Sequence, residues 1–380
     1  MKKILSIVLG SVLLVVNAWN PTYAEAAKGP GLGLGDSYTY KAPIEIGPGV
    51  SVTEGENDFF QREVSNPIVK RTDRYSYDQM AADIQALQAV YGDKMQVNVI
   101  GTSLDGRNIY DIIVGNPSAG KHIMIQGSIH AREYITTLLM MEQMEFALAN
   151  YDTGHYNRKP LSEMFLQTAV HFVPMSNPDG VSLSQFGIDA IRSESLRQGI
   201  RIAYDKDVAK ERVSDPFEVY LTKWKNNAGG VDLNHNFETA WNSITGVADF
   251  PSYAGYKGTW PLSEPETQAL AGMANRYPWA ATISYHAMGE VIYWNADTSI
   301  KKLESLNLAQ SLAMMNGYAL DGSDGKGGYK DWMQSRTGAV PSVTIEVGKE
   351  VCPVSFAQYP TIWAQNKGVW VQAMDYVMKH

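Results

Sequence analysis

His130 and Glu133 are the first residues in this chain whose types and spacing indicate chemistry. They lie three positions apart in Gly127-Ser-Ile-His-Ala-Arg-Glu133, just after the apolar run 123–125. If a helix follows over 134–148, as its apolar residues predict, positions i and i+3 share a face and the two side chains converge. Zinc prefers such nitrogen and oxygen ligands, and a catalytic zinc takes three from the protein. A polar helix start, with Glu133 near the positive end of the dipole, is the alternative. A metal site therefore requires a third ligand elsewhere.

Four short apolar runs alternate with helical patterns, which predicts an α/β sheet covered by helices. The runs are 123–125, 170–173, 281–284 and 343–347. Polar residues follow three of them: His130 after the first, His286 after the third, and Glu346 at the end of the last. Open α/β sheets bind ligands at the carboxyl ends of their strands. We therefore expect these side chains to meet at one edge of the sheet.

Three further patterns describe the segments around these strands. Ser76 is a candidate N-cap for a helix that ends at Gly92, with an apolar face of Met80, Ile84, Leu87 and Val90. Residues 97–100 and 109–114 predict a β-hairpin that turns through Asp105-Gly106. The stretch 150–253 is rich in loop residues, and we expect it to shape a pocket rather than to form a second domain.

Residues 1–24 have the three zones of a secretory signal peptide: Lys2-Lys3, an apolar run over 4–16, and small residues ending at Ala24. The run is too short for a membrane span. We therefore expect a secreted protein, extracellular or associated with the cell wall, without stable membrane insertion. The formal net charge of −8 argues against a nucleic-acid partner. Cys352 is the only cysteine, which excludes an intramolecular disulfide.

The rest of the chain divides at about residue 70. Residues 25–70 are rich in glycine and proline without a sustained period. This composition predicts an N-terminal extension or pro-segment, and an ordered arm wrapped on the domain is the alternative. Residues 71–380 are expected to form one catalytic domain. The sequence leaves the oligomeric state open.

The order and the flanks of the chemical residues resemble those of the zinc carboxypeptidase family. The resemblance runs from about Tyr75 to the C-terminus and includes several separated motifs: Ser176-Asn-Pro-Asp-Gly180, Gly230-Val-Asp-Leu-Asn234, Thr282-Ile-Ser-Tyr-His286, Val343-Thr-Ile-Glu346 and Asp331-Trp332. It implies a zinc metallopeptidase with one Zn²⁺ per chain. It also implies an α/β fold in which a mixed, mostly parallel sheet is sandwiched between helices.

The resemblance assigns a role to each matching residue. His130, Glu133 and His286 would hold the zinc, and Glu346 would be the general base that takes a proton from water. Asp232 would bond a zinc histidine and fix its tautomer. Lys225 stands where the family has an arginine that stabilises the tetrahedral intermediate, but a lysine lacks the planar donor pair. Arg132 would lie near the substrate and help to hold a carboxylate.

Departures from the family pattern concern the substrate. Asn234-His235 replaces the Asn-Arg pair that clamps a terminal carboxylate, and Ser323 stands where the family has a tyrosine. Lys330 precedes Asp331 where an apolar or acidic specificity residue is usual, and a cation there would favour a carboxylate on the substrate side chain. Glu290 could then meet an amine. These features are similar to the bacterial branch that cuts γ-D-glutamyl-meso-diaminopimelate bonds in peptidoglycan peptides.

We therefore expect a secreted peptidase that acts on cell-wall muropeptides. A secreted carboxypeptidase that removes C-terminal residues from ordinary peptides is the first alternative. The second is a non-catalytic zinc-containing protein that binds the cell wall. Glu346 argues against it, because a binding module needs no base beside the metal.

Overall fold

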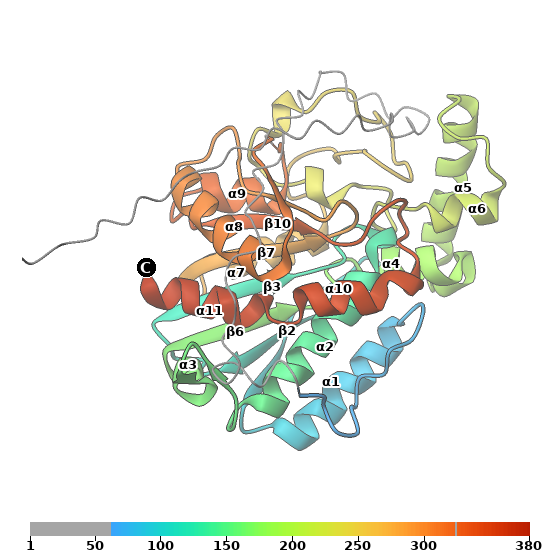
Figure 1. Cartoon of the computed structure of the whole chain (residues 1–380). Helices are drawn as coiled ribbons and strands as arrows, with labels where there is room; N and C mark the ends of the chain where they lie inside the picture. Colours follow the sequence, from blue (N-terminus) through green and yellow to red (C-terminus); the bar gives the residue numbers. More distant parts are fainter. Residues whose placement is uncertain (1–61, 324) are drawn as a thin grey trace, which may run out of the picture.

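A computed structural model describes residues 62–323 and 325–380. Its centre is an eight-stranded sheet with helices on both faces (Figure 1). The strands are β1 (Met95–Thr102), β2 (Asn108–Gly115), β3 (Lys121–Gln126), β6 (Thr168–Val173), β7 (Trp279–His286), β8 (Val291–Tyr293), β9 (Ala319–Asp321) and β10 (Ser342–Glu346). A separate two-stranded ribbon consists of β4 (His155–Tyr156) and β5 (Lys159–Pro160).

Eleven α-helices accompany the sheet in the described part of the chain. They are α1 (Tyr77–Tyr91), α2 (Ile135–Asn150), α3 (Leu161–Gln167), α4 (Pro178–Phe186), α5 (Glu194–Ala209), α6 (Phe217–Thr222), α7 (Pro265–Met273), α8 (Lys302–Asn316), α9 (Tyr329–Ser335), α10 (Tyr359–Asn366) and α11 (Val369–Lys379). Within these described ranges, no helix combines the length and apolarity that crossing a membrane requires.

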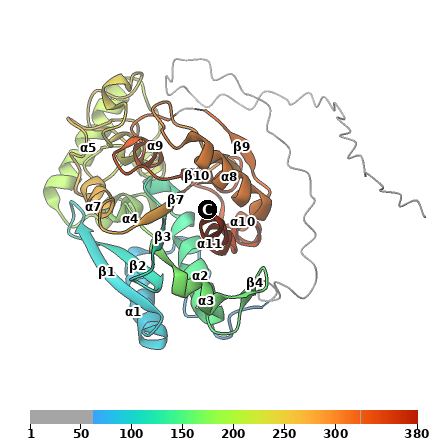
Figure 2. The same cartoon turned by 90° about the vertical axis from the view of Figure 1, so that its left-hand side faces the viewer.

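The strand order is β1-β2-β6-β3-β7-β10-β8-β9. The pairs β6–β3, β3–β7, β7–β10 and β8–β9 are parallel, whereas β1–β2, β2–β6 and β10–β8 are antiparallel. The β1–β2 hairpin and β9 lie at opposite edges (Figure 2). This arrangement confirms the expected mixed, mostly parallel sheet between helix layers.

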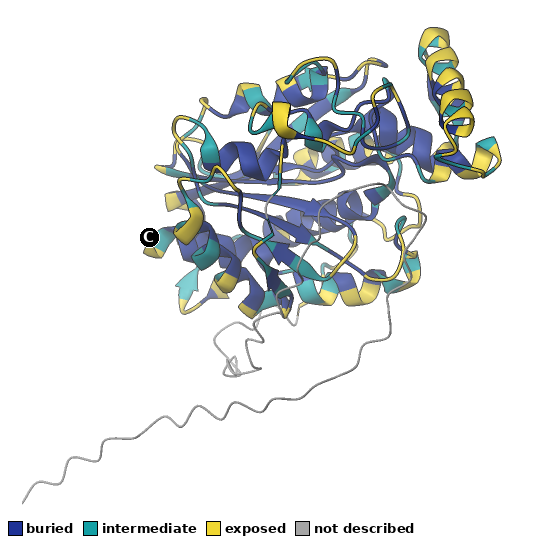
Figure 3. Cartoon of the chain, turned by 90° about the horizontal axis from the view of Figure 1, so that it is seen from above, coloured by how far each residue is buried: buried dark blue, intermediate teal, exposed yellow. Residues whose placement is uncertain are grey.

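The central strands are apolar on both faces because helices cover both. In β3, Ile123 and Ile125 belong to the larger core, which includes residues of α1, α2, α8, α10 and α11. Met124 points the other way, into a second core with residues of α7 and α9. The strands accordingly form a continuous buried layer (Figure 3). A run without alternation is what a strand covered on both sides requires.

Local patterns predicted α1 and the hairpin correctly, with one exception. Ser76 accepts a hydrogen bond from the Gln79 amide and caps α1, and Met80, Ile84 and Leu87 are buried. Val90, expected on the same face, is 61% exposed. It lies in the last turn at the margin of the apolar stripe, and the neighbouring Tyr91 packs on the core there instead.

The stretch 150–253 is more helical than expected, because it contains α3, α4, α5 and α6 besides β6. Helices α5 and α6 project from the body of the molecule (Figures 1 and 3). They pack on a smaller core, in which Ile200 and Ala203 of α5 meet Tyr220 of α6, and which also includes Leu183 of α4 and Ala131. The prediction of a loop-rich stretch was therefore wrong here.

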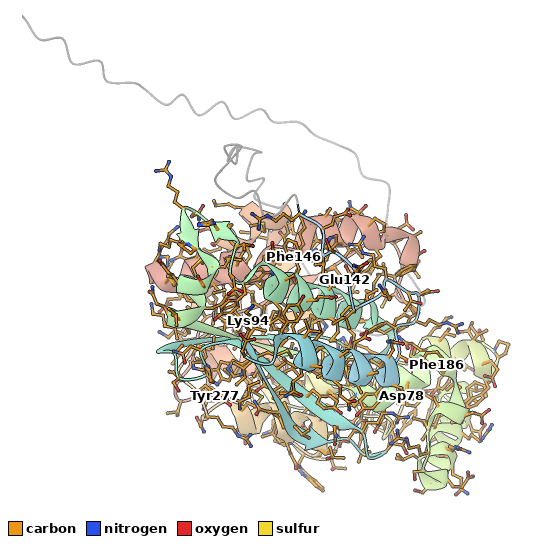
Figure 4. The ribbon with its side chains drawn as sticks, turned by 90° about the horizontal axis from the view of Figure 1, so that it is seen from below. Asp78, Lys94, Glu142, Phe146, Phe186 and Tyr277 are labelled. Carbon is orange, nitrogen blue, oxygen red and sulfur yellow. The ribbon has the colours of Figure 1, made fainter. Side chains whose placement is uncertain are left out.

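Residues 62–70 contact the domain, and whether the extension is a pro-segment or a permanent arm stays a prediction. The Glu145 carboxylate accepts hydrogen bonds from the amides of Ile68 at 2.7 Å and Val69 at 2.9 Å. Next in the chain, Arg71 donates to Glu142 at 3.0 Å, and Glu142 and Phe146 lie one turn apart on α2 (Figure 4). The expected signal peptide, 1–24, and residues 25–61 of the extension lie outside the described residues.

Candidate active site

Three neighbouring parallel strands deliver the predicted ligands and base to one edge of the sheet. His130 directly precedes and Glu133 ends a 3₁₀ turn, η2 (Ala131–Glu133), which follows β3. His286 is the last residue of β7, and Glu346 is the last residue of β10. The two strands pair in register, with Glu346 directly opposite His286. The expectation that these residues meet at the carboxyl edge is confirmed.

His130, Glu133 and His286 form one buried cluster. The Nδ1 atom of His130 lies 2.8 Å from one Glu133 oxygen, and the Nδ1 atom of His286 lies 2.9 Å from the other. The two Nδ1 atoms are 3.1 Å apart. One ligand atom from each side chain can be chosen so that all lie within 4.8 Å of one another.

The donor set fits a zinc ion. A carboxylate oxygen only accepts hydrogen bonds, so His130 Nε2, 3.2 Å from Asp232 Oδ1, carries the ring proton. Its Nδ1 atom then presents a lone pair to Glu133 and to the second imidazole. Lone pairs and a carboxylate at such distances repel unless a proton or a cation lies among them, and two nitrogens with one carboxylate oxygen suit Zn²⁺. The place of Asp232 behind His130 agrees with its predicted orienting role.

The charges around the cluster shift its acids in opposite directions. Burial alone would raise the pKa of Glu133, but the His130 and His286 rings hold it well below its usual range. Burial raises the pKa of Glu346 to about 8, and the nearby Glu133 carboxylate adds to this effect. A bound cation would lower the pKa of Glu346 again, because it favours the charged form.

Lys225 is tied to the same histidine through Asp232. Its Nζ atom lies 2.8 Å from Asp232 Oδ2, and its carbonyl oxygen accepts the Ala131 amide at 2.8 Å. The Lys225 charge therefore sits beside the zinc ligands but is shared with Asp232. Stabilisation of the tetrahedral intermediate by Lys225 stays a prediction.

Arg132, Asn234 and His235 also lie around the cluster. Arg132 is in η2, and its buried Nε atom has no hydrogen-bond partner among the described residues. The side-chain oxygen of Asn234 accepts the Tyr329 amide at 3.1 Å, which fixes the orientation of its carboxamide. His235 Nδ1 lies 3.4 Å from Asp232 Oδ2. Contact of these three residues with substrate remains a prediction.

Lys330 forms an ion pair with its own neighbour in the chain, Asp331. Lys330 is only 6% exposed, and its ammonium group contacts the carboxylate of Asp331 and the carbonyl of Asn295. Asp331 therefore already compensates the charge that was expected to meet a substrate carboxylate. The signal was available in the sequence, because the acid is the next residue.

Glu290 likewise has partners of its own. Its carboxylate lies 2.7 Å from Lys349 Nζ and accepts a hydrogen bond from Gln365 at 3.3 Å. Gln365 belongs to α10, which packs on the larger core, whereas Lys330 belongs to α9 on the second core. No contact between Glu290 and Lys330 is found in the described part of the chain, because each side chain has partners of its own. Contact of Lys330 and Glu290 with substrate stays a prediction.

No tyrosine close to Ser323 in sequence fills the family position. Tyr329 is completely buried, with its hydroxyl against Met124, and Tyr318 is 4% exposed, with its hydroxyl donating to Gln365. Both rings belong to the cores. Ser323 itself donates from its amide to Asp321 at 2.7 Å.

Comparison with known proteins agrees with this geometry. The model of the zinc carboxypeptidase family, peptidase M14, matches residues 80–367. The chain belongs to the zinc carboxypeptidase family. With the His-x-x-Glu motif and the distant histidine brought together, this member of the family is a zinc metallopeptidase.

Individual relatives of this member of the family include a bacterial enzyme and two animal structures. Gamma-D-glutamyl-L-diamino acid endopeptidase 1 of Lysinibacillus sphaericus is 30% identical over 310 residues, covering 81% of this chain and 74% of that protein. Bovine thrombin-activatable fibrinolysis inhibitor has a TM-score of 0.62 at 18% identity, covering 82% and 99% of the two chains. Carboxypeptidase A from Helicoverpa armigera has a TM-score of 0.59 at 19% identity, covering 82% and 76%. The two structures support the shared fold.

Proposed function

We propose that this protein is an exported zinc peptidase that hydrolyses the γ-D-glutamyl-meso-diaminopimelate bond of peptidoglycan peptides. The observation that carries the peptidase chemistry is the buried cluster of His130, Glu133 and His286, with Glu346 opposite His286 on the next strand. The substrate is supported by the similarity to a gamma-D-glutamyl-L-diamino acid endopeptidase over 81% of the chain. The signal-peptide pattern of residues 1–24 supports export.

The residues present divide the work of hydrolysis among them. His130, Glu133 and His286 would hold zinc, which when bound lowers the pKa of a water molecule and polarises a carbonyl oxygen. Glu346 takes a proton at its carboxylate and returns it to the leaving amine. Asp232 keeps the His130 proton on Nε2. Lys225 supplies positive charge on the side where the oxyanion develops, and Arg132 helps to hold a substrate carboxylate.

The replacement of the family's arginine by His235 supports a substrate other than an ordinary peptide C-terminus. An arginine offers two parallel donors to a carboxylate, whereas an imidazole offers one at most in that direction. His235 Nδ1 lies 3.4 Å from Asp232 Oδ2, and this Nδ1 atom has no hydrogen-bond partner within the residues that the structure describes. Weaker binding of the terminal carboxylate is compatible with a substrate that is recognised mainly through its γ-linked D-glutamyl peptide.

Product analysis separates this proposal from its alternatives. The purified protein with zinc is incubated with a tripeptide that ends in γ-D-glutamyl-meso-diaminopimelate and, separately, with unmodified L-peptides. Mass spectrometry should show free diaminopimelate from the first and little cleavage of the second. Cleavage of the L-peptides alone would establish a general carboxypeptidase instead. Binding of the tripeptide without products would establish the non-catalytic alternative.

A further inference from the structure

Two loops meet beside the zinc site, and their relative position sets the direction of His130, whereas the third ligand, His286, comes from β7. The ligand loop, 127–133, carries His130 and Glu133, and the partner loop, 224–235, carries Lys225 and Asp232. The backbones meet where the Ala131 amide donates to the Lys225 carbonyl at 2.8 Å. The bond between His130 and Asp232 crosses the same boundary.

The side chain of Asn177 forms hydrogen bonds with both loops and so bridges them. Its Nδ2 atom donates to the carbonyl of Ile129 at 3.1 Å and to the carbonyl of Asn226 at 3.1 Å. Ile129 directly precedes His130, and Asn226 directly follows Lys225. Asn177 is completely buried, so water does not compete for these bonds.

The side-chain carboxamide of Asn177 also caps the N-terminus of helix α4. The Oδ1 atom of Asn177 accepts the Gly180 amide at 3.0 Å and caps α4. The backbone amide of Asn177 donates to the carbonyl of Ser128, again in the ligand loop, at 3.2 Å. An acceptor is needed on the helix side and two N–H donors on the loop side. Among residues that commonly cap a helix, only asparagine offers both.

Gly180 provides an independent observation of the same bridge. A Cβ atom added at Gly180 would lie 2.5 Å from the carbonyl oxygen of Asn226 and 2.6 Å from Asn177 Nδ2. Any side chain at Gly180 would therefore displace the bridge, because the Asn226 carbonyl belongs to the backbone and cannot rotate away as a side chain could. The motif Ser176-Asn-Pro-Asp-Gly180 thus contains both the bridging residue and the space that it needs.

We propose that Asn177 is a positioning residue for the zinc site, holding the ligand loop in register with the partner loop. Two carbonyl groups adjacent to His130 and Lys225 are fixed to one nitrogen atom. Without it, the loops keep the Ala131–Lys225 and His130–Asp232 contacts but lose the bridge beside them, so the direction of the His130 Nδ1 atom toward the metal is held less tightly. Partners that orient metal ligands typically change metal affinity or activity by about 10–100-fold when removed.

The test uses substitutions that keep the helix cap and remove the bridge. Asn177→Asp retains an acceptor for the Gly180 amide but turns a carboxylate toward two carbonyl oxygens. Asn177→Ser also caps, carries no charge and is too short to reach both loops, so it decides the question if the Asp variant fails to fold. Asn150→Asp is the matched control, because Asn150 is buried and donates to Phe146 at the far end of α2.

Zinc affinity is measured by competition with a chelator, together with the thermal midpoint of the metal-free protein and with kcat and KM. We expect both Asn177 variants to bind zinc about 10–100-fold more weakly. Their kcat should fall while KM stays unchanged. Their thermal midpoints should not be lower than that of Asn150→Asp. Gly180→Ala should repeat this pattern, whereas Gly120→Ala, where a Cβ meets nothing within 4 Å, should not.

Wild-type zinc affinity in Asn177→Ser would overturn the proposal, as would an equal loss of affinity in Asn150→Asp. Because the zinc titration needs no substrate, its outcome is independent of the proposed muropeptide specificity. A protein that fails to cleave diaminopimelate peptides but shows the expected zinc affinities would contradict the proposed function alone.

Discussion

Replacing Asp232 with asparagine is the most direct test of how the site controls its histidine. The Asp232 carboxylate is completely buried and accepts from three donors: His130 Nε2 at 3.2 Å, Lys225 Nζ at 2.8 Å and the Asn234 amide at 3.1 Å. Burial alone would raise the pKa of Asp232, but Lys225, His235 and His130 hold it well below its usual range. Asp232 is therefore ionised, and its surroundings stabilise the negative charge.

Asparagine has the same shape but only one acceptor oxygen. If its NH₂ group faces His130, the ring must accept there, so the proton moves to Nδ1 and that atom can no longer bind a metal. If the NH₂ group faces Lys225, a largely buried ammonium group loses its counter-ion. Each lost hydrogen bond to a charged group costs about 1.5–3 kcal/mol. We expect zinc affinity to fall by about 10–100-fold, and kcat to fall with it.

Asp207→Asn is the matched control for Asp232→Asn. Asp207 is also completely buried and accepts from Arg212, Tyr220 and Ser252, but it lies on α5. The control should lose stability in urea without losing zinc affinity by chelator competition. The reasoning is refuted if Asp232→Asn binds zinc within twofold of the wild type, or if Asp207→Asn weakens zinc binding as much.

Four further predictions follow from the site and its surroundings. Glu346→Gln should keep zinc and lower kcat by about 10²–10⁴-fold, and near wild-type turnover with zinc bound would exclude Glu346 as the base. Lys330→Met leaves the buried Asp331 carboxylate without its counter-ion, so it should lower the free energy of unfolding in urea by about 3–5 kcal/mol. It should also raise KM equally for diaminopimelate and neutral peptides, and a rise in KM for diaminopimelate peptides alone would support the specificity role of Lys330. Burial, with Asp179 adding to it, raises the pKa of Glu266 to about 8 from 4.5. The folded state therefore binds the extra proton, and stability should fall between pH 4.5 and 8 by up to about 1.4 kcal/mol per unit; urea titrations of Glu266→Gln should lack this slope. Chelation should abolish hydrolysis and lower the thermal midpoint, and zinc should restore both with one ion per chain by native mass spectrometry.

Patterns that depend on neighbouring residues were predictable from the sequence. The cap at Ser76, the hairpin turn and the apolar runs of β3, β6, β7 and β10 follow from local preference and burial period, and they appear where expected. The ligands and Glu346 were predictable for a related reason. Polar residues at the ends of parallel strands share an edge whatever the details of packing.

Long-range pairs were not predictable in the same way, whereas helix α5 was missed although its signal is local. Ser193 caps α5, and Leu196, Ile200 and Ala203 recur on one face at the helical period. The contact of Glu290 with Gln365 of α10 and the bridge made by Asn177 depend on which buried groups meet. A sequence states which side chains can donate, accept or carry charge. Packing alone decides which partners they find, because a buried polar group must be satisfied by whatever the fold brings within reach.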